Sequence, residues 1–452
     1  MHYDMLMRST FLLNDIANEF TEVRKNTMDI FSPLDIEDAV IQSSNFGSPP
    51  NWHIAHVTWF FQKILEKYGR GVVFDNKFNL NYLNSYYNKY GKILLKNERG
   101  KYPRPTVIQS LKYRSEIEKH FIDYLKSLDK EGFSDRLILD IYTAINHEMQ
   151  HQELMVYDFQ HYFNRFPEEG DNYCPKKRNK KIPIREKINK EMIDIAGGIF
   201  ELGYNGKDFC YDNELPENKN YLNPYRIDNS LVTNGDFMQF MGDGGYTNYR
   251  YWLADGWDLV REENWLCPLY WYFDENKKKW FKKDFRGINE IVFDEPVVNV
   301  SYYEADAFAK WAKKRLPTEV EWEKAASWDE KNKLKTIYPW GNQSPFSNYA
   351  NLFESFQWSP SILGSYPSGK SHYGCYQMIG DVWEWTSSEY ALYPGFKSRF
   401  EEYTDKWAIN QKVLRGGCFA TSVKQIRNSY RNYYKPHERI PFAGFRCVKD
   451  LN

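Results

Sequence analysis

The residue pattern changes abruptly near the middle of the chain, and this change limits the fold more than any other feature. Up to about Pro167, apolar residues recur every three or four positions and glycines are few, as in amphipathic helices. After Ile193, Gly, Asn, Asp and Pro separate short aromatic segments, as in residues 196–206 (AGGIFELGYNG). This second part lacks the strand–helix alternation of a doubly wound sheet. The sequence therefore predicts an all-α part followed by an α+β part.

A basic stretch separates the two parts. Residues 174–190 (CPKKRNKKIPIREKINK) contain eight basic residues and one acidic residue. The whole chain has 60 Lys and Arg against 61 Asp and Glu, so its net charge of −1 provides no field to attract nucleic acid. The stretch is therefore interpreted as a solvated linker. We place an all-α domain at 1–172, the linker at 173–192 and the second domain at 193–452, within the two or three domains that 452 residues accommodate.

The chain also carries signals about its cellular setting. No apolar run approaches the ~18–20 residues that a membrane span needs. The N-terminal segment has acids among its apolar residues and resembles an amphipathic helix more than a signal peptide. The six cysteines are scattered without CxxC spacing, which argues against a cysteine-built zinc site. We expect a cytoplasmic protein without nucleic-acid or membrane partners.

Two histidines mark the clearest predicted helix, which begins after the N-cap residue Ser134 and must end before Pro167. His147 and His151 are four residues apart, so their imidazoles share one face. Leaving two buried imidazoles without partners would cost about 1–3 kcal/mol each, whereas a divalent metal ion bound by both would remove that cost. Both histidines continue an apolar stripe formed by Leu137, Ile141 and Ala144, and the stripe extends to Leu154 and Asp158.

A third ligand is expected from residues 48–68, where His53 and His56 lie at the start of another helix. His56 is in register with Trp52, Trp59 and Phe60. His53 is equally compatible with the helix pattern at a polar edge, so periodicity does not choose between the two histidines.

Residues 147–151 (HEMQH) also match the HExxH motif of zinc peptidases, with Glu148 as the general base. The metzincin extension is missing, because Leu154 and Tyr157 occupy the positions that need Gly and His. A peptidase is therefore disfavoured. Packing of lone histidines in a core is the other alternative to a metal site.

Several long motifs together carry a resemblance to a known family. Residues 48–62 (SPPNWHIAHVTWFFQ) and 146–155 (NHEMQHQELM) resemble the DinB-like helical domain of hercynine oxygenases, the sulfoxide synthases of ergothioneine biosynthesis. Later segments resemble the formylglycine-generating-enzyme domain that follows in those enzymes. The later segments are AGGIFELG, LVTNGDFMQFMGDGGY, SYYEADAFAKWAKKRLPTEVEWEKAA, PWGN, GDVWEWTSSEY and residues 413–447. The resemblance implies an all-α DinB-like bundle followed by an α+β formylglycine-generating-enzyme (C-type-lectin-like) fold.

The resemblance implies a reaction and a metal site. His56, His147 and His151 would hold non-haem Fe(II), with Glu153 completing the family's HxxxHxE pattern, so His56 is preferred to His53. Open positions on the metal would admit a thiolate, the substrate imidazole and O₂. The implied oxidoreductase joins a thiol to imidazole carbon 2 of hercynine (Nα-trimethylhistidine) and yields a sulfoxide.

The resemblance also implies substrate contacts for residues in both domains. Asn432 and Tyr433 would contact hercynine, Tyr433 through cation–π attraction to the trimethylammonium group, and Gln150 would bond its imidazole. The alternative is that Tyr433 and Tyr434 only pack a C-terminal strand. Arg99 and Arg104 are candidates to hold the carboxylate of the thiol donor; alternatively, either could be an ordinary surface arginine.

A tyrosine is expected to supply a proton or an electron. Tyr393 matches the active-site tyrosine of one branch of the family, and the pair Tyr86 and Tyr87 matches that of a second branch, which accepts free cysteine. The NSYY run resembles the second branch. Tyr434 stands where the γ-glutamylcysteine branch has an acidic residue, which also favours L-cysteine as donor.

One departure and several alternatives complete the predictions. Formylglycine-generating enzymes depend on a C-terminal cysteine pair, which Cys418 and Cys447 do not reproduce. Both cysteines are predicted core residues, and the second domain is predicted to be a substrate-binding scaffold that could also hold a structural Ca²⁺ ion. The alternatives are a 5-histidylcysteine sulfoxide synthase of the ovothiol type, a variant with a selenium donor, a DinB-like metal-dependent thiol transferase and a non-catalytic binding module.

Overall fold

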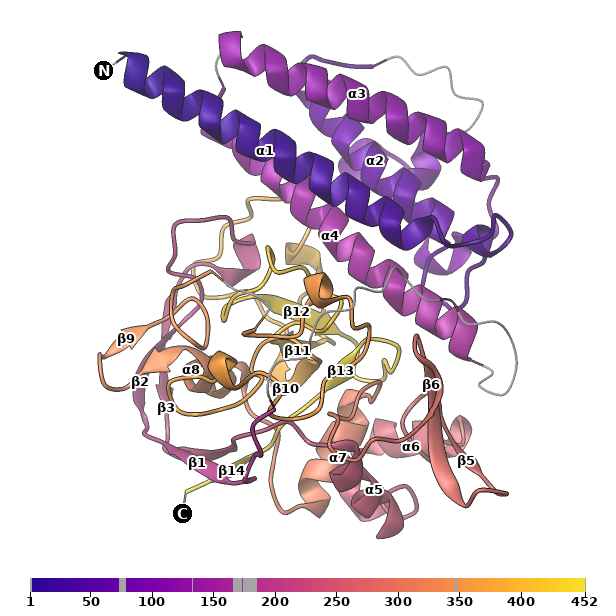
Figure 1. Cartoon of the computed structure of the whole chain (residues 1–452), viewed down its shortest axis with the longest axis vertical. Coiled ribbons are helices and arrows are strands. Elements are labelled where there is room, and N and C mark those ends of the chain that lie inside the picture. Colours follow the sequence, from indigo (N-terminus) through magenta and orange to yellow (C-terminus); the bar gives the residue numbers. More distant parts are fainter. Residues whose placement is uncertain are drawn as a thin grey trace. The chain divides into compact units, whose positions relative to one another are not determined.

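The chain forms two compact units, residues 1–162 and 163–452, which are described separately (Figure 1). The computed structural model describes residues 2–72, 79–131, 133–165, 173, 185–344 and 348–451. Of the predicted linker at 173–192, residues 174–184 lie outside the described residues. No helix in the described part of the chain combines the length and apolarity needed to cross a membrane.

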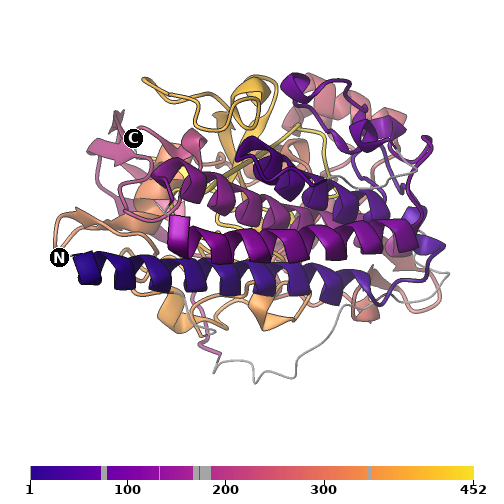
Figure 2. The same cartoon turned by 90° about the horizontal axis from the view of Figure 1, so that it is seen from above.

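The first unit is a bundle of long helices that lie side by side (Figure 2). Short 3₁₀ segments occur at Asp38–Val40, Leu80–Leu83, Asn88–Tyr90 and Lys96–Glu98. The all-α prediction for this part of the chain is confirmed. The long helices are α1 (His2–Phe31), α2 (Pro50–Lys67), α3 (Val107–Glu131) and α4 (Asp135–Asn164).

Local sequence explains where α2 and α4 begin. Pro50 occupies the first turn of α2, where its fixed φ favours the helix and its missing N–H costs nothing. The Ser134 hydroxyl accepts the backbone N–H of Leu137 at 3.2 Å and caps α4. Both predicted limits of α4 are confirmed. The predicted apolar stripe of α4 is buried and comprises Leu137, Ile141 and Ala144.

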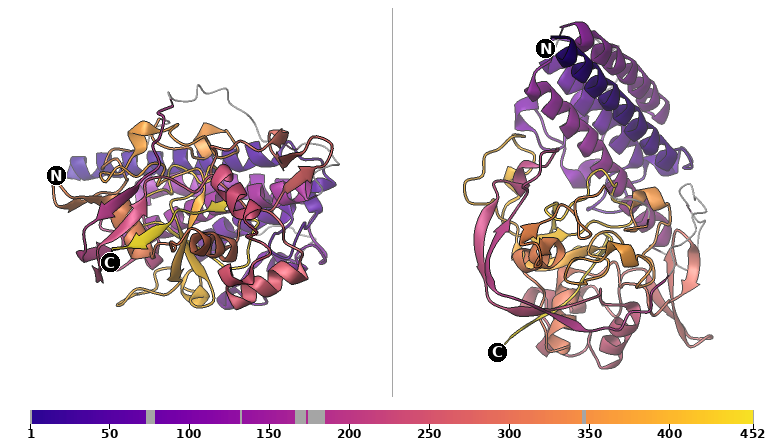
Figure 3. Two further views of the ribbon diagram at one scale, coloured as in Figure 1. Left: turned by 90° about the horizontal axis from the view of Figure 1, so that it is seen from below. Right: turned by 60° about the vertical axis from the view of Figure 1, so that its left-hand side comes forward.

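The second unit combines small, mainly antiparallel sheets with short helices and long loops. One three-stranded sheet has the order β1 (Met192–Ile195), β4 (Tyr225–Asp228), β14 (Val448–Asp450). Another has the order β5 (Trp271–Asp274), β6 (Lys279–Asp284), β7 (Gly287–Glu290). Strands β2 (Gly198–Leu202) and β3 (Asn218–Leu222) run side by side as a separate ribbon (Figure 3), and β8 (Trp328–Asp329) pairs with β9 (Leu334–Lys335).

A four-stranded sheet carries the predicted substrate segment. Its order is β12 (Arg431–Tyr434), β11 (Lys412–Arg415), β10 (Trp383–Glu389), β13 (Ala443–Gly444), and only β10 and β13 pair in parallel. The helices are α5 (Asn234–Gly242), α6 (Ala254–Glu262), α7 (Tyr302–Trp311) and α8 (Glu319–Ser327). The prediction of an α+β second part is confirmed.

Capping explains the helix pair predicted at 301–327. Ser301 with Glu304 begins α7, and Thr318 with Glu321 begins α8, each as a reciprocal capping box. Trp322 of α8 is fully buried in a cluster with residues of β1, β2 and β4. Cys418 and Cys447 are fully buried, as expected for core residues.

The buried stripe of α4 should be essential to the first unit. Ile141→Ala is expected to lower the free energy of unfolding by about 2–5 kcal/mol, because it leaves a cavity at a fully buried position. Ile108→Ala on α3 is the matched control, since Ile108 is 72% exposed, and should change stability by less than about 0.5 kcal/mol. Denaturant unfolding of the full chain, followed by helical circular dichroism, makes the comparison. Equal effects of the two substitutions would contradict the packing described here.

Candidate metal centre

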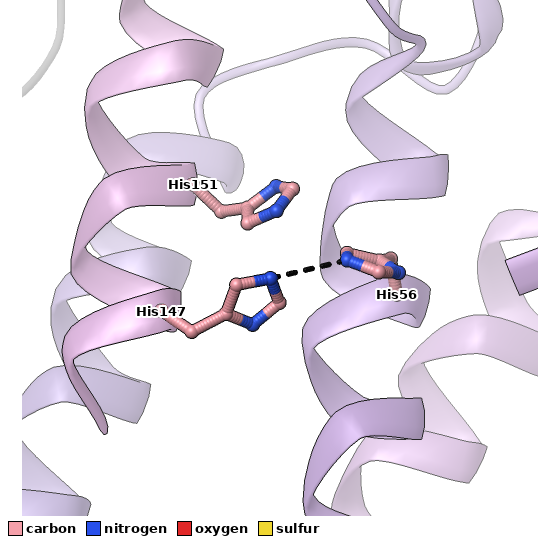
Figure 4. A group of neighbouring side chains, drawn as sticks. All are labelled: His56, His147 and His151. Carbon is pink, nitrogen blue, oxygen red and sulfur yellow. Dashed lines mark hydrogen bonds between the residues drawn. The ribbon is translucent and has the colours of Figure 1, made fainter. Parts of the chain in front are cut away.

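Three histidines from two helices converge in the first unit. His56 comes from α2, and His147 and His151 come from successive turns of α4; their imidazoles point toward one another (Figure 4). All three are buried, and one ring nitrogen of each lies within 4.8 Å of the others. The Nε2 atoms of His56 and His147 are 3.2 Å apart. The structure therefore brings together the three residues that were predicted as metal ligands.

Aromatic side chains and one backbone carbonyl orient these rings. His56 Nδ1 lies 2.6 Å from the carbonyl oxygen of Leu83, so Nδ1 donates and Nε2 keeps its lone pair. The Trp52 ring stacks on His56 with centroids 4.4 Å apart and an interplanar angle of 11°. Phe60 packs against His147, also at 4.4 Å. The rings are held in place by apolar packing as well as by hydrogen bonds.

Burial keeps the three imidazoles neutral. Loss of solvation is the largest cause that lowers the pKa of each histidine, and it brings the pKa of His147 to about 3. For His56 and His151 the next cause is the neighbouring His147. Metal ions bind the neutral form of histidine, so the protonation state suits a metal site. Three imidazoles fit Fe, Zn, Cu or Ni and leave further coordination positions open.

The structure separates His53 from His56, which periodicity alone did not. His53 lies behind His151, with the two Nδ1 atoms 2.7 Å apart, and its Nε2 is 2.9 Å from Asp158 Oδ2. It is not part of the group of three. The sequence analysis did not predict that Asp158 contacts His53. The available signal was the position of Asp158 in the apolar stripe after His151.

Glu148 has an environment that excludes the role of a peptidase base. Its carboxylate accepts hydrogen bonds from Arg24 at 3.0 Å, Arg114 at 2.7 Å and the Thr27 hydroxyl at 2.6 Å. Burial alone would raise the pKa of Glu148, but Arg114 and Arg24 lower it to about 2. A carboxylate that is fully buried and paired in this way has no site at which to activate a water molecule. The literal HExxH motif is thus structural.

The predicted tyrosine pair of the first unit lies near the histidines. Tyr87 is buried, and its ring is 5.9 Å from that of Phe60, which packs on His147. The Tyr86 and Tyr87 rings are 4.6 Å apart, and their hydroxyls are 3.4 Å apart. The structure therefore links Tyr87 to His147 through the Phe60 ring, and Tyr86 lies next to Tyr87.

Of the two predicted donor-site arginines, Arg99 is buried and Arg104 is exposed. The Arg99 guanidinium lies 3.6 Å from the ring centroid of Trp52 and donates to the Ser48 hydroxyl at 2.8 Å. Burial lowers the pKa of Arg99 to about 9, while Tyr86 and Asp158 act to raise it. Both arginines line one pocket, together with Asn51, Trp52, Tyr82, Leu83, Leu94, Tyr102, Pro103 and Pro105. Gln150 is half-buried on α4.

The remaining predicted residues belong to the second unit. Asn432, Tyr433 and Tyr434 are half-buried on β12, and the Tyr433 ring stacks on Tyr390 at 3.9 Å. Tyr433 therefore also packs within its own unit, as the structural alternative expected. Tyr393 is buried, with the Arg431 guanidinium 4.2 Å from its ring centroid, and burial raises the pKa of its hydroxyl.

Comparison with known proteins places the chain in a family. The DinB superfamily model matches residues 19–155, and the sulfatase-modifying factor enzyme 1-like domain model matches residues 179–451, more than half of the chain. The hercynine oxygenase of Mycolicibacterium smegmatis is 35% identical over 350 residues, covering 75% of this chain and 77% of the relative. The chain belongs to the hercynine oxygenase family. The predicted family and the predicted DinB-like and formylglycine-generating-enzyme-like domains are confirmed.

Two further members of the hercynine oxygenase family align with the chain. The hercynine oxygenases of Mycobacterium tuberculosis and Mycolicibacterium thermoresistibile are 40% and 38% identical over 256 and 261 residues. These alignments span less than two thirds of the relatives, 59% and 57% of their lengths. Since the named relatives are oxygenases, the prediction of an oxidoreductase is confirmed.

Glu148 should stabilise the first unit without binding metal. Glu148→Gln is expected to lower the free energy of unfolding by about 3–5 kcal/mol, because it leaves two buried guanidinium groups with one carboxylate fewer. Glu116→Gln, at a weak and exposed pair with Lys112, is the matched control and should have little effect. Metal stoichiometry, measured on both folded variants, should stay at the wild-type value. Loss of metal from Glu148→Gln alone would contradict this assignment.

Acid should destabilise the metal-free protein. The unfolded chain protonates its histidines near pH 6.5, whereas the buried imidazoles resist protonation to lower pH, down to about 3 for His147. Between these limits the unfolded state binds more protons, so stability should fall as the pH drops below 6.5. Denaturation midpoints between pH 8 and pH 5 measure this slope, which His147→Ala should flatten. A midpoint that rises on acidification would rule out burial of neutral imidazoles.

Proposed function

We propose that this chain is a non-haem Fe(II), O₂-dependent sulfoxide synthase that joins the sulfur of L-cysteine to imidazole carbon 2 of hercynine. The observation that carries the proposal is the buried group His56, His147 and His151 in a member of the hercynine oxygenase family. A closed structural zinc site would use four protein ligands, whereas three imidazoles leave room for substrates. The proposed cofactor is Fe(II), with O₂ as co-substrate.

The chain's own residues would bind, orient and protonate the reactants. Fe(II), when bound by the three histidines, supplies the O₂-dependent redox chemistry. The helices and aromatic rings around the histidines exclude bulk water. We assign the donation of a proton during sulfoxidation to the hydroxyl of Tyr87 or of its neighbour Tyr86. The Tyr87 ring packs on Phe60, which packs on His147, and the Tyr86 ring packs on Tyr87. Tyr393 is the alternative for this role.

L-Cysteine is proposed as the sulfur donor. Arg99 is the stronger candidate for holding its carboxylate, because this buried guanidinium packs on Trp52, which in turn stacks on His56. Arg104, which is exposed, is the second proposed contact. By resemblance, Tyr434 stands where the γ-glutamylcysteine branch of the family has an acidic residue, which also supports cysteine over γ-glutamylcysteine.

Hercynine is proposed as the acceptor of the sulfur. By resemblance, Asn432 and Tyr433 would contact its trimethylammonium-carboxylate end, and Gln150 would bond its imidazole. A trimethylammonium group over an aromatic ring gains roughly 1–2 kcal/mol when desolvated.

Among the described residues, the three histidines are the only group of His, Cys, Asp or Glu with metal-binding geometry. A structural Ca²⁺ ion and a cytoplasmic location stay predictions.

Oxygen uptake tests the proposal. Anaerobically purified, Fe(II)-loaded protein is given cysteine with either hercynine or histidine, and the products are weighed by mass spectrometry. We expect uptake with hercynine and a product whose mass equals both substrates minus two hydrogens plus one oxygen, because the C–S bond replaces a C–H and an S–H bond and the second oxygen atom leaves as water. The same product type from histidine in preference to hercynine would assign the ovothiol-type reaction. No uptake with any thiol or selenol would overturn the synthase proposal in favour of a transferase or a binding module.

Matched substitutions test the residue roles. His147→Ala should abolish uptake, whereas His120→Ala, at an exposed position on α3, should not. Tyr87→Phe should slow sulfoxide formation by about 10²–10⁴-fold, the usual contribution of a positioned proton donor. Tyr249→Phe, at a 59% exposed position, is its control. A large loss in Tyr393→Phe with none in Tyr87→Phe and Tyr86→Phe would transfer the role to Tyr393.

A further inference from the structure

A continuous hydrogen-bonded series lies behind His151. Asp158 Oδ2 is 2.9 Å from His53 Nε2, and His53 Nδ1 is 2.7 Å from His151 Nδ1. All three side chains are buried. Asp158 lies seven residues after His151 on α4, and His53 lies three residues before His56 on α2. The series thus joins the two helices that carry the three-histidine group, on the side of His151.

The chemistry of each group sets the direction of the series. An ionised carboxylate has only acceptors, so His53 Nε2 must donate to Asp158. A neutral imidazole that donates from Nε2 accepts at Nδ1, so His151 Nδ1 must donate to His53. His151 then carries its proton on Nδ1, and Nε2 has the lone pair that a metal ion needs.

The loop before α2 is shaped around Asp158. The backbone N–H of Ser48 donates to Asp158 Oδ2 at 3.1 Å, the same oxygen that accepts from His53. A Cβ atom on Gly47 would lie 2.0 Å from Asp158 Oδ1, so only glycine leaves room for the carboxylate. The carboxylate therefore has a defined position relative to both α2 and α4.

We propose that His53 and Asp158 are positioning residues of the metal centre, which fix the tautomer and ring orientation of His151 through two consecutive hydrogen bonds. The inference rests on the proposed metal site. Partners of this kind behind a metal-binding histidine contribute about 10–100-fold to metal affinity. His56 has the simpler arrangement, a single hydrogen bond to the Leu83 carbonyl. His56 and His151 are thus oriented by different acceptors: a backbone carbonyl for His56, and for His151 a second imidazole that is itself bonded to a carboxylate.

Titration with Co(II), monitored by its visible absorption, tests the role in metal binding. Asp158→Asn and His53→Phe should each weaken Co(II) binding by about 10–100-fold. If the series acts as one unit, the double variant should bind no more weakly than the weaker single variant. Asp140→Asn is the matched control, because Asp140 is also buried on α4 but pairs with Lys67 and Arg136. It should bind Co(II) as the wild type does.

Histidine tautomers provide a readout that a purely structural role would not change. In metal-free protein with ¹⁵N-labelled histidine, long-range ¹H–¹⁵N spectra should show His151 with its proton on Nδ1 and His53 with its proton on Nε2. Asp158→Asn should convert or mix both tautomers, since an amide can donate to His53 Nε2. Circular dichroism identifies any variant that does not fold, and His53→Phe then carries the test.

The outcomes separate this inference from the proposed function. Wild-type protein that fails to bind Co(II) through His147 would overturn the metal site and this inference with it. Wild-type binding with unchanged affinity in Asp158→Asn and His53→Phe would overturn the inference alone. Additive losses in the double variant, or a His151 proton on Nε2 in the wild type, would also overturn it.

Discussion

The first unit depends on the burial of neutral imidazoles between two helices. Each ring of His56, His147 and His151 must direct one nitrogen inward, and its other nitrogen cannot reach bulk water. For His56 the outer partner is a carbonyl of the segment after α2, and for His151 it is a second histidine backed by a carboxylate. The packing of α2, α4 and the loop before α2 meets this requirement for both His56 and His151.

Helix α4 also buries a full negative charge next to His147. Glu148 follows His147 directly, yet it meets Arg24 from α1 and Arg114 from α3, and Glu118 pairs with both arginines. Successive residues of a helix point about 100° apart, so a neutral site and a charged cluster can occupy adjacent faces. The charged cluster ties three helices together and sets the rotation of α4. Breaking such a buried cluster is costly, so α4 is held with its histidines inward.

Much of the second unit is loop, so its buried backbone carbonyls need hydrogen-bond donors other than a neighbouring strand. Its core holds buried arginine–carboxylate pairs in which the arginine also donates to loop carbonyls, as Arg431 does to Asn213 and Ala391 while pairing with Glu319. Arg415 with Glu323, Arg427 with Glu214 and Arg446 with Glu384 are further pairs of this type. Buried loop carbonyls need such donors where no strand partner is available. Strand β12, which carries Asn432 and Tyr433, is anchored at Arg431 in this way.

The amino-acid sequence by itself determined the all-α and α+β parts, the limits of α4 and the shared face of His147 and His151. Local rules of periodicity and capping decide those features. The family resemblance favoured His56 over His53 as the partner of this pair, and the tertiary structure brings His56 to it. Only the tertiary structure decided that His53 lies behind His151 with Asp158 and that Glu148 is held by arginines. These outcomes depend on the rotation and offset of α2 against α4, and local periodicity carries no information on either. His53 and His56 are three positions apart in α2 and fit the helix pattern equally well. The facing helix α4 selects between them.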